Sequence, residues 1–388
     1  MMVSILEDEA IRFAGAQDLA RRPTGVTPRR LPSWAAHEVH DPIFQFTAAM
    51  ASGVRIVFAS DTNAVEIDAM LTGIEWPEVR GPSPRFDLVV DGHTVATRQS
   101  KDGGRWIVTA GGEAMPYSVE FRAGEPSHVR FDGLGTSMKR IELWLPQNCS
   151  VEVRDLRIDD TAMAQPAPTD GRRWLHYGSS ISHCNEAEGP TETWPAIAAR
   201  LGGVDLTSFG FAGQCHLDQC VARTMRDLPA DLISIKVGIN VVNGDTMRER
   251  VFVPALHGFI DTLRDGHPMT PLLVVTPIIY AAGEDHPGPS IVRDGKSAVV
   301  DRPAELAYGA LSIGRIRRLI ADVVERRQKV GDAQLHLLDG RELFGESDVG
   351  DLPDGLHPNN AGYRRMGERF AALAFGESGA FANTNSDR

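Results

Sequence analysis

Cysteine is scarce in this chain of 388 residues, which contains four cysteines and no Cys-x-x-Cys pair. So few cysteines exclude a disulfide framework in a protein of this length. Cysteine adjoins histidine at His183-Cys184 and at Cys215-His216, but neither spacing is that of a common structural zinc site. We therefore expect free thiols, no metal centre and no resident cofactor.

Long hydrophobic runs and an excess of basic residues are also lacking. No apolar stretch approaches the roughly 18 residues that mark a membrane-spanning helix. Residues 1–9 are acidic and carry no basic region followed by an apolar core, so we expect no signal peptide. The formal net charge of −12 argues against broad binding to nucleic acid or to anionic membranes. These absences predict a cytoplasmic protein, and they leave its substrate and its oligomeric state open.

The first part of the chain has the pattern of a β domain. From about residue 36 to residue 160, short stretches are strand-like, as in 54–59 and in 64–71, where apolar residues alternate with polar ones. Asp91-Gly92 is the turn signal of a β-hairpin. Many short strands separated by turn residues predict a β-sandwich, of jelly-roll type, as a domain of residues 1–160.

The rest of the chain has an α/β pattern. Residues 161–172 contain two prolines and no periodic pattern, which indicates a linker. Strand-like and helix-like stretches then alternate, which predicts an α/β domain over residues 173–388, with a parallel sheet covered by helices on both faces. Within it we expect residues 278–302 to form a long loop that is either a functional lid or disordered, and residues 303–327 to form a helix.

Unusual residues follow the predicted strands of this second domain. Ser180 lies in the turn of Tyr177–Ser182, while Gly213 and Asn240 come shortly after two further strands. The carboxyl ends of parallel strands meet at one edge of the sheet, where such sheets bind ligands. We therefore expect these three residues to lie close together.

Asp354 and His357 add a base to this group. An Asp three residues before a His can hold one ring nitrogen, so that the other faces outward as a base. A serine hydroxyl needs such a base to attack an acyl carbon. The resulting oxyanion needs donors, for which the backbone N–H groups of Ser180 and Gly213 and the side-chain amide of Asn240 are candidates.

Four short motifs resemble the blocks of the SGNH (GDSL-like) hydrolase and acyltransferase superfamily. They occur in the family's order and spacing over about residues 172–376, as Gly178–Ser182, Gly210–Gly213, Gly238–Val241 and Asp354–His357. The resemblance implies a three-layer α/β/α, flavodoxin-like domain. It also implies that Ser180 is the nucleophile and that Asp354 and His357 complete a catalytic triad. Gly213 and Asn240 would be oxyanion donors in addition to the N–H of Ser180.

Three residues depart from the family's pattern. Ser179 and Val241 stand where the family usually has Asp, and Cys184 stands where two-domain members usually have Gly. The tandem serines leave Ser179 as an alternative nucleophile. We favour Ser180, because Ile181-Ser182 then fall where the family has its apolar and hydroxyl residues.

The resemblance implies acyl transfer through an acyl-Ser180 intermediate. In layout the chain is similar to a two-domain family member that moves an aromatic acyl group from a coenzyme A thioester to a tetracycline. We expect transfer from a thioester such as acyl-CoA to a hydroxyl of a natural product. The alternative is an esterase or deacetylase acting on a small ester or an acetylated carbohydrate, which exposed tryptophans clustered on the sandwich would favour; the candidates are Trp34, Trp76, Trp106 and Trp144. A binding protein without catalysis is disfavoured by the intact Ser180, Asp354 and His357.

Overall fold

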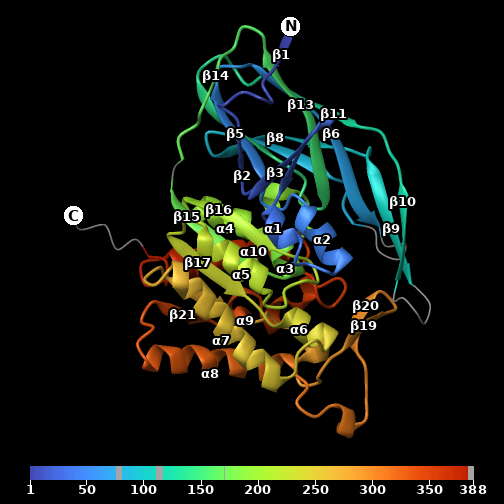
Figure 1. Ribbon diagram of the computed structural model, residues 1–388, viewed down its shortest axis with the longest axis vertical. Coiled ribbons are helices and arrows are strands. Elements are labelled where there is room, and N and C mark those ends of the chain that lie inside the picture. The colour runs from blue at the N-terminus through green and yellow to red at the C-terminus, as the bar shows by residue number, and fades with distance from the viewer. Residues whose placement is uncertain (76–80, 111–116, 170, 383–388) are drawn as a thin grey trace. The chain divides into compact units, whose positions relative to one another are not determined.

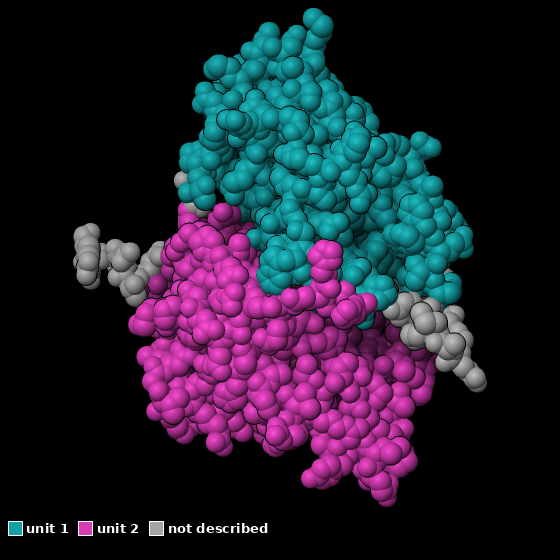
Figure 2. All heavy atoms as spheres, viewed as in Figure 1, with its two compact units in different colours: residues 1–36, 41–170, 185–192 teal, residues 37–40, 171–184, 193–388 magenta. Residues whose placement is uncertain are grey.

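The computed structural model describes residues 1–75, 81–110, 117–169 and 171–382. The chain forms two compact units, which Figure 2 distinguishes by colour. Unit 1 comprises Met1–Ala36, Asp41–Asp170 and Asn185–Glu192; unit 2 comprises His37–His40, Gly171–Cys184 and Thr193–Arg388. The predicted boundaries did not anticipate that Asn185–Glu192 belongs with the first part of the chain.

Unit 1 contains two sheets, to which the labelled strands β5, β6 and β13 in Figure 1 belong. The eight-stranded sheet has the order β10-β9-β6-β13-β4-β3, with β1 on β13 and β11 on β6. Its strands are β1 (Met2–Ser4), β3 (Asp18–Arg22), β4 (Gly25–Arg29), β6 (Ala64–Glu75), β9 (Gly104–Ala110), β10 (Tyr117–Arg122), β11 (Ser127–Asp132) and β13 (Cys149–Asp159). The six-stranded sheet has the order β14-β5-β12-β7-β8, with β2 on β5. Its strands are β2 (Arg12–Ala14), β5 (Arg55–Ser60), β7 (Arg85–Val90), β8 (His93–Gln99), β12 (Lys139–Trp144) and β14 (Ala164–Gln165).

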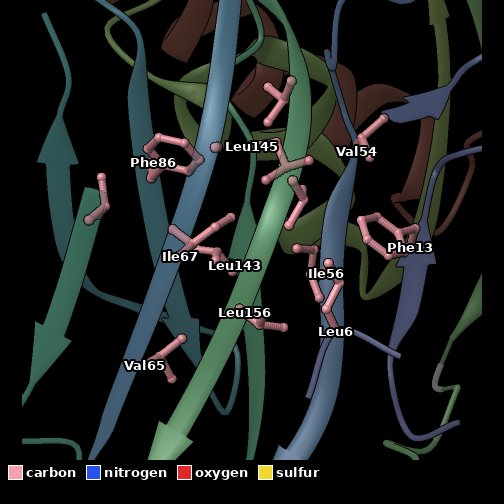
Figure 3. Packing of buried hydrophobic residues seen from close by; sticks show 14 of the residues in the cluster. Leu6, Phe13, Val54, Ile56, Val65, Ile67, Phe86, Leu143, Leu145 and Leu156 are labelled. Atoms are coloured by element: carbon pink, nitrogen blue, oxygen red, sulfur yellow. The ribbon is translucent and has the colours of Figure 1, made fainter. Parts of the chain in front are cut away.

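One hydrophobic cluster joins side chains of both sheets of unit 1 (Figure 3). Val65 and Ile67 of β6 belong to it together with Ile56 of β5 and Leu143 of β12. The alternation in the sequence produces this burial, because every second side chain of a strand points to the same face. Complete burial of one such side chain contributes roughly 1.5–3 kcal/mol. Two short helices, α1 (Ser33–Ala36) and α2 (Pro42–Ala49), complete the regular structure of the N-terminal region.

The predicted linker is partly strand. Within residues 161–172, β14 pairs antiparallel with β5, and β15 of unit 2 already begins at Arg172. The prolines do not prevent this pairing, because Ala164 and Gln165 precede both of them.

Unit 2 contains a five-stranded parallel sheet with the order β16-β15-β17-β18-β21. Its strands are β15 (Arg172–Gly178), β16 (Val204–Gly210), β17 (Leu232–Lys236), β18 (Leu272–Val275) and β21 (Leu335–Leu338). Gly178 lies opposite both Gly210 and Lys236, so three strands end level with one another. The residues that follow them therefore start from one edge of the sheet, as expected.

The helices of unit 2 alternate with these strands (Figure 1). They are α3 (Ser180–His183), α4 (Trp194–Gly202), α5 (Gln219–Asp227), α6 (Ile239–Gly244), α7 (Glu249–Gly266), α8 (Ile313–Lys329), α9 (Gly340–Leu343) and α10 (Asn360–Phe370). Within the described ranges, no helix combines the length and the hydropathy needed to cross a bilayer.

Two expectations for unit 2 are wrong in detail. The expected loop of residues 278–302 contains a hairpin of β19 (Ser290–Arg293) and β20 (Lys296–Val299). The expected helix of residues 303–327 begins only at Ile313, where the Ser312 side chain accepts from the backbone N–H of Arg315. The chain cannot be helical through Gly309, because this residue has a φ of +72°.

Candidate active site

The nucleophile turn joins the end of β15 to the one-turn helix α3. Ser179 is the N-cap of α3, and its hydroxyl accepts a hydrogen bond from the N–H of Ile181 at 3.3 Å. Ser179 is fully buried, whereas the next residue, Ser180, retains a little exposure. A side chain at Gly178 would collide with the hydroxyl of Ser182, so this turn requires glycine.

Ser180, His357 and Asp354 form a continuous hydrogen-bonded chain. Nε2 of His357 lies 2.8 Å from Oγ of Ser180, and Nδ1 of His357 lies 2.6 Å from Oδ2 of Asp354. The other oxygen of Asp354 accepts from the backbone N–H groups of Leu356 and His357, at 2.8 and 2.7 Å. The carboxylate therefore orients the ring, which directs Nε2 to the Ser180 hydroxyl.

The carboxylate of Asp354 stays ionised over a wide pH range. Burial acts to raise its pKa, but the hydrogen bond and the charge of His357, with the two backbone N–H donors, lower it to about 2. A charged carboxylate at Nδ1 stabilises the imidazolium that forms when Nε2 takes a proton. This arrangement suits His357 to act as a general base.

Asn240 lies at the start of α6, after Gly238, which has a φ of +117°. Its side-chain Oδ1 accepts a hydrogen bond from the backbone N–H of Cys215 at 3.0 Å. Because the carbonyl end of the amide accepts this bond, the NH₂ end is the one available for a ligand oxygen. Val241, the departure from the family's Asp, is buried.

Gly213 lies exposed in the loop after β16, with a φ of +73°. The positive φ favours glycine. An added Cβ would meet no neighbouring atom, so the backbone conformation alone restricts the residue at this position. The loop is held by His183, whose Nδ1 accepts from the N–H of Ala212 at 3.3 Å. The role of Gly213 as an oxyanion donor stays a prediction.

A buried polar chain beneath the nucleophile was missed in the sequence. Nε2 of His176 lies 2.8 Å from Oγ of Ser182 on α3, and Nδ1 lies 2.7 Å from Oγ of Ser234 on β17. Ser234 in turn accepts from the indole N–H of Trp174 at 2.8 Å. Polar residues inside the otherwise apolar strands β15 and β17 were the signal that could have revealed it.

The buried surroundings of these hydrogen-bonded side chains disfavour the charged forms of His176 and Lys236. Burial, with the charge of Lys236 as a further cause, lowers the pKa of His176 to about 3, so the ring is neutral. Lys236 ends β17 and is itself buried, which lowers its pKa to about 8. Its Nζ has no hydrogen-bond partner among the described residues.

The four cysteines are buried free thiols. Among the residues that the structure describes, no group of three or more His, Cys, Asp or Glu side chains could hold a metal ion. Burial raises the pKa of the Cys215 thiol to about 12, so this thiol is a poor nucleophile. Cys184 closes α3 in the left-handed conformation (φ 58°, ψ 51°), which explains why glycine is usual at this position.

Comparison with known proteins places this geometry in a family. Residues 176–365 match the GDSL-like Lipase/Acylhydrolase family. Among solved structures, the salicylyl-acyltransferase SsfX3 from a tetracycline biosynthetic pathway is 27% identical, with 95% of each chain covered and a TM-score of 0.79. A comparison with curated proteins gives no match.

Two more distant structures share the fold. A protein described as a GDSL-like lipase from Bacteroides ovatus is 19% identical, with 95% of each chain covered and a TM-score of 0.66. A family two carbohydrate esterase from Clostridium thermocellum is 14% identical over 93% of this chain and 96% of the other, with a TM-score of 0.59. The expected family is confirmed: the protein is an acyltransferase or ester hydrolase of the GDSL type, and residues 176–365 form its GDSL-like lipase/acylhydrolase domain.

Proposed function

We propose that the protein transfers an acyl group through a covalent intermediate on Ser180. The observation that carries this proposal is the hydrogen bond of 2.8 Å between Nε2 of His357 and Oγ of Ser180, backed by Asp354 at the other ring nitrogen. The same side chains supply a nucleophile, a base and an orienting carboxylate, so the reaction needs no metal or cofactor.

In the first half-reaction, Oγ of Ser180 attacks the acyl carbon of a thioester while Nε2 of His357 takes the hydroxyl proton. The carbonyl oxygen becomes an oxyanion, which accepts hydrogen bonds from the N–H groups of Ser180 and Gly213 and from the amide of Asn240. The C–S bond then breaks, and the thiol leaves with the proton of His357. The acyl group remains on Ser180 as an ester.

In the second half-reaction, the base activates an acceptor hydroxyl. His357 takes the proton of this hydroxyl, whose oxygen attacks the acyl-Ser180 carbonyl. The ester bond to Ser180 breaks, and Oγ regains its proton from His357. With water as the acceptor the same steps give hydrolysis, so the outcome depends on how well the site excludes water.

The proposed substrate class comes from the similarity to SsfX3. SsfX3 is a salicylyl-acyltransferase, and 95% of each chain is covered at 27% identity. We infer an aromatic acyl group, delivered by a thioester such as acyl-CoA, and a natural product that bears the acceptor hydroxyl. Antibiotic biosynthesis and a cytoplasmic location are proposed with it.

We also propose a sandwich and a three-layer architecture. The two sheets of unit 1 would be the layers of a jelly-roll sandwich, because their strands bury one shared cluster. Unit 2 would be a three-layer α/β/α domain, which its parallel strand order supports. Residues 161–172 stay the proposed junction between domains of residues 1–160 and 173–388.

A carbohydrate esterase or deacetylase is the second candidate. Trp106 packs on Phe121 with ring centroids 4.7 Å apart and lies 6.5 Å from Phe46. Phe121 is 49% exposed, so this group presents aromatic surface on which a sugar ring could stack. Of the other tryptophans considered, Trp34 is exposed and Trp144 is buried, while Trp76 lies outside the described residues.

The nucleophile is tested by intact mass after incubation with an activated aryl ester. We expect an added mass of one acyl group on the wild-type protein and none on Ser180→Ala. Ser179→Ala is the matched control, since it removes the neighbouring hydroxyl and should still form the adduct. An adduct that persists in Ser180→Ala would overturn the assignment.

Transfer and hydrolysis are separated by product partitioning. An aromatic acyl thioester is supplied with increasing concentrations of an alcohol acceptor, and ester and free acid are both measured. Transfer predicts that the ester fraction rises with acceptor. Free acid alone at every acceptor concentration, with acetylated sugars hydrolysed, would favour the second candidate.

A further inference from the structure

The loop between α3 and α4 belongs to unit 1, although both helices belong to unit 2. It comprises Asn185–Glu192 and begins two residues after the end of α3, the helix that starts at Ser180. Thr193, the residue that follows it, is the N-cap of α4. Contacts that unit 1 makes with this loop therefore restrain a segment that is covalently joined to the nucleophile helix.

Asp87 of β7 is the main anchor of the loop. This aspartate is fully buried, and its Oδ2 accepts from the hydroxyl of Thr191 at 2.7 Å and from the backbone N–H of Thr191 at 3.2 Å. Its other oxygen accepts from Nε of the buried Arg85 at 2.7 Å. A buried carboxylate that loses a partner is costly, so Thr191 is held firmly in this position.

Two further contacts fix the middle of the loop. Nε2 of Gln147 donates to the backbone oxygen of Ala187 at 2.8 Å, and Arg85 pairs with Glu188 at 3.2 Å. Gly189 packs so closely on the guanidinium of Arg85 that a Cβ would collide with it. Gln147 therefore holds the loop at Ala187, Arg85 holds it at Glu188 and Gly189, and Asp87 holds its end at Thr191.

Helix α3 depends on the segments at both of its ends. A helix of one turn has little stability of its own. Before it, β15 is fixed in the sheet; after it, Cys184 adopts a left-handed conformation that a residue other than glycine keeps only when its surroundings impose it. The anchored loop supplies that constraint on the C-terminal side.

We propose that Arg85, Asp87 and Gln147 of unit 1 are positioning residues for the reaction at Ser180. They contribute no atom to the chemistry, and they hold the α3–α4 loop so that α3 presents the Ser180 hydroxyl to His357. The inference rests on the proposed function, because it assumes that Ser180 is the nucleophile.

The test compares Thr191→Val with Thr191→Ser in the full chain. Valine removes the hydroxyl that Asp87 binds, with little change of volume, whereas serine keeps it. The readouts are the rate of acyl-Ser180 formation from an activated aryl ester, followed by intact mass, and the Tm. We expect Thr191→Val to slow acylation by about 10- to 100-fold, because small misplacements of reacting groups have effects of this size. Thr191→Ser should restore the rate.

Ser127→Ala is the control for a loss of stability alone. Ser127 and Ser100 are buried in unit 1 and share a hydrogen bond of 2.6 Å that does not involve the loop. We expect this variant to lower the Tm without slowing acylation. The proposal is overturned if Thr191→Val acylates at the wild-type rate, or if its rate falls no more than that of Ser127→Ala at a matched loss of Tm.

Failure of the proposed function gives a different result. If the wild-type protein forms no adduct on Ser180, the nucleophile assignment is wrong and this inference falls with it. If the wild-type protein forms the adduct and Thr191→Val forms it equally fast, only the positioning role is wrong.

Discussion

The carboxamide of Asn240 is oriented by a contact with the backbone of Cys215. Its Oδ1 accepts from the N–H of Cys215, which leaves the NH₂ group for a ligand oxygen. The motif predicted the residue, but the acceptor that orients it comes from a different loop. Aspartate has the same shape as asparagine and no N–H donor. Replacing Asn240 by aspartate therefore tests the loss of the donor while the contact with Cys215 can still form.

Asn240→Asp is expected to lower kcat by about 10²- to 10³-fold with an aryl ester substrate, because one oxyanion donor is lost. The carboxylate can still accept from Cys215, so folding should be little affected. Asn243→Asp on the same helix is the control and should leave kcat unchanged. Full activity in Asn240→Asp would contradict the donor role.

Cys184 stands where two-domain members of the family usually have glycine, and its backbone has the left-handed conformation that glycine adopts most easily. It has a positive φ, and its thiol donates to the backbone oxygen of Ile181 at 3.2 Å. Cys184→Ala loses the thiol and keeps the strained conformation, whereas Cys184→Gly loses the thiol and relieves the strain. We expect the free energy of unfolding, measured with urea, to be about 1 kcal/mol higher for Cys184→Gly than for Cys184→Ala. Equal stability of the two variants would show that the backbone is not strained there.

At the scale of the element, strands β15 and β17 carry polar side chains into the interior. His176, Ser182 and Ser234 link the two strands to α3. The neutral His176 ring satisfies both hydroxyls, and its protonated form is disfavoured by burial and by Lys236. The stability of this assembly must therefore depend on pH.

The pKa of His176 is about 3 in the folded protein and about 6.5 in an unfolded chain. Between these values the unfolded state binds more protons, so the free energy of unfolding falls as pH decreases from about 6.5 towards 3. The slope is at most about 1.4 kcal/mol per pH unit from this one group. We expect the stability difference between wild type and His176→Gln to shrink from pH 7 to pH 4 in urea unfolding. A difference for His176→Gln that stays constant from pH 7 to pH 4 would refute the assignment.

The hairpin of β19 and β20 shows which element could have been predicted. Asp294 and Gly295 both have positive φ values, as do Asp91 and Gly92 at the turn between β7 and β8. The same Asp-Gly signal predicts a turn at Asp91, whereas residues 278–302, which include Asp294, have the pattern of a loop. The flanking residues explain the difference, because the exposed strands beside Asp294 lack the apolar run that precedes Asp91.

At the scale of the whole molecule, the chain crosses between units at Cys184 and returns at Thr193. A fragment of residues 171–388 would retain the α3–α4 loop and lose Arg85, Asp87 and Gln147, which hold it. We expect limited proteolysis to cut this fragment within Asn185–Glu192 and to leave the same segment intact in the full chain. Fragment masses identify the site, and equal protection in both proteins would contradict the anchoring.

Local patterns along the chain were enough to predict the family, the succession of a β-rich part and an α/β part, and the residues of the four motifs. They were enough because side-chain alternation and strand-then-turn order are local properties, and because parallel strands bring the residues at their carboxyl ends to one edge. The tertiary structure decided which of two adjacent serines lies beside the imidazole: the hydroxyl of Ser179 caps α3, and that of Ser180 reaches His357. It also decided that Thr191 belongs with Asp87, which lies 104 residues away. Such a pair depends on long-range packing of the whole chain, and no local pattern in the sequence records it.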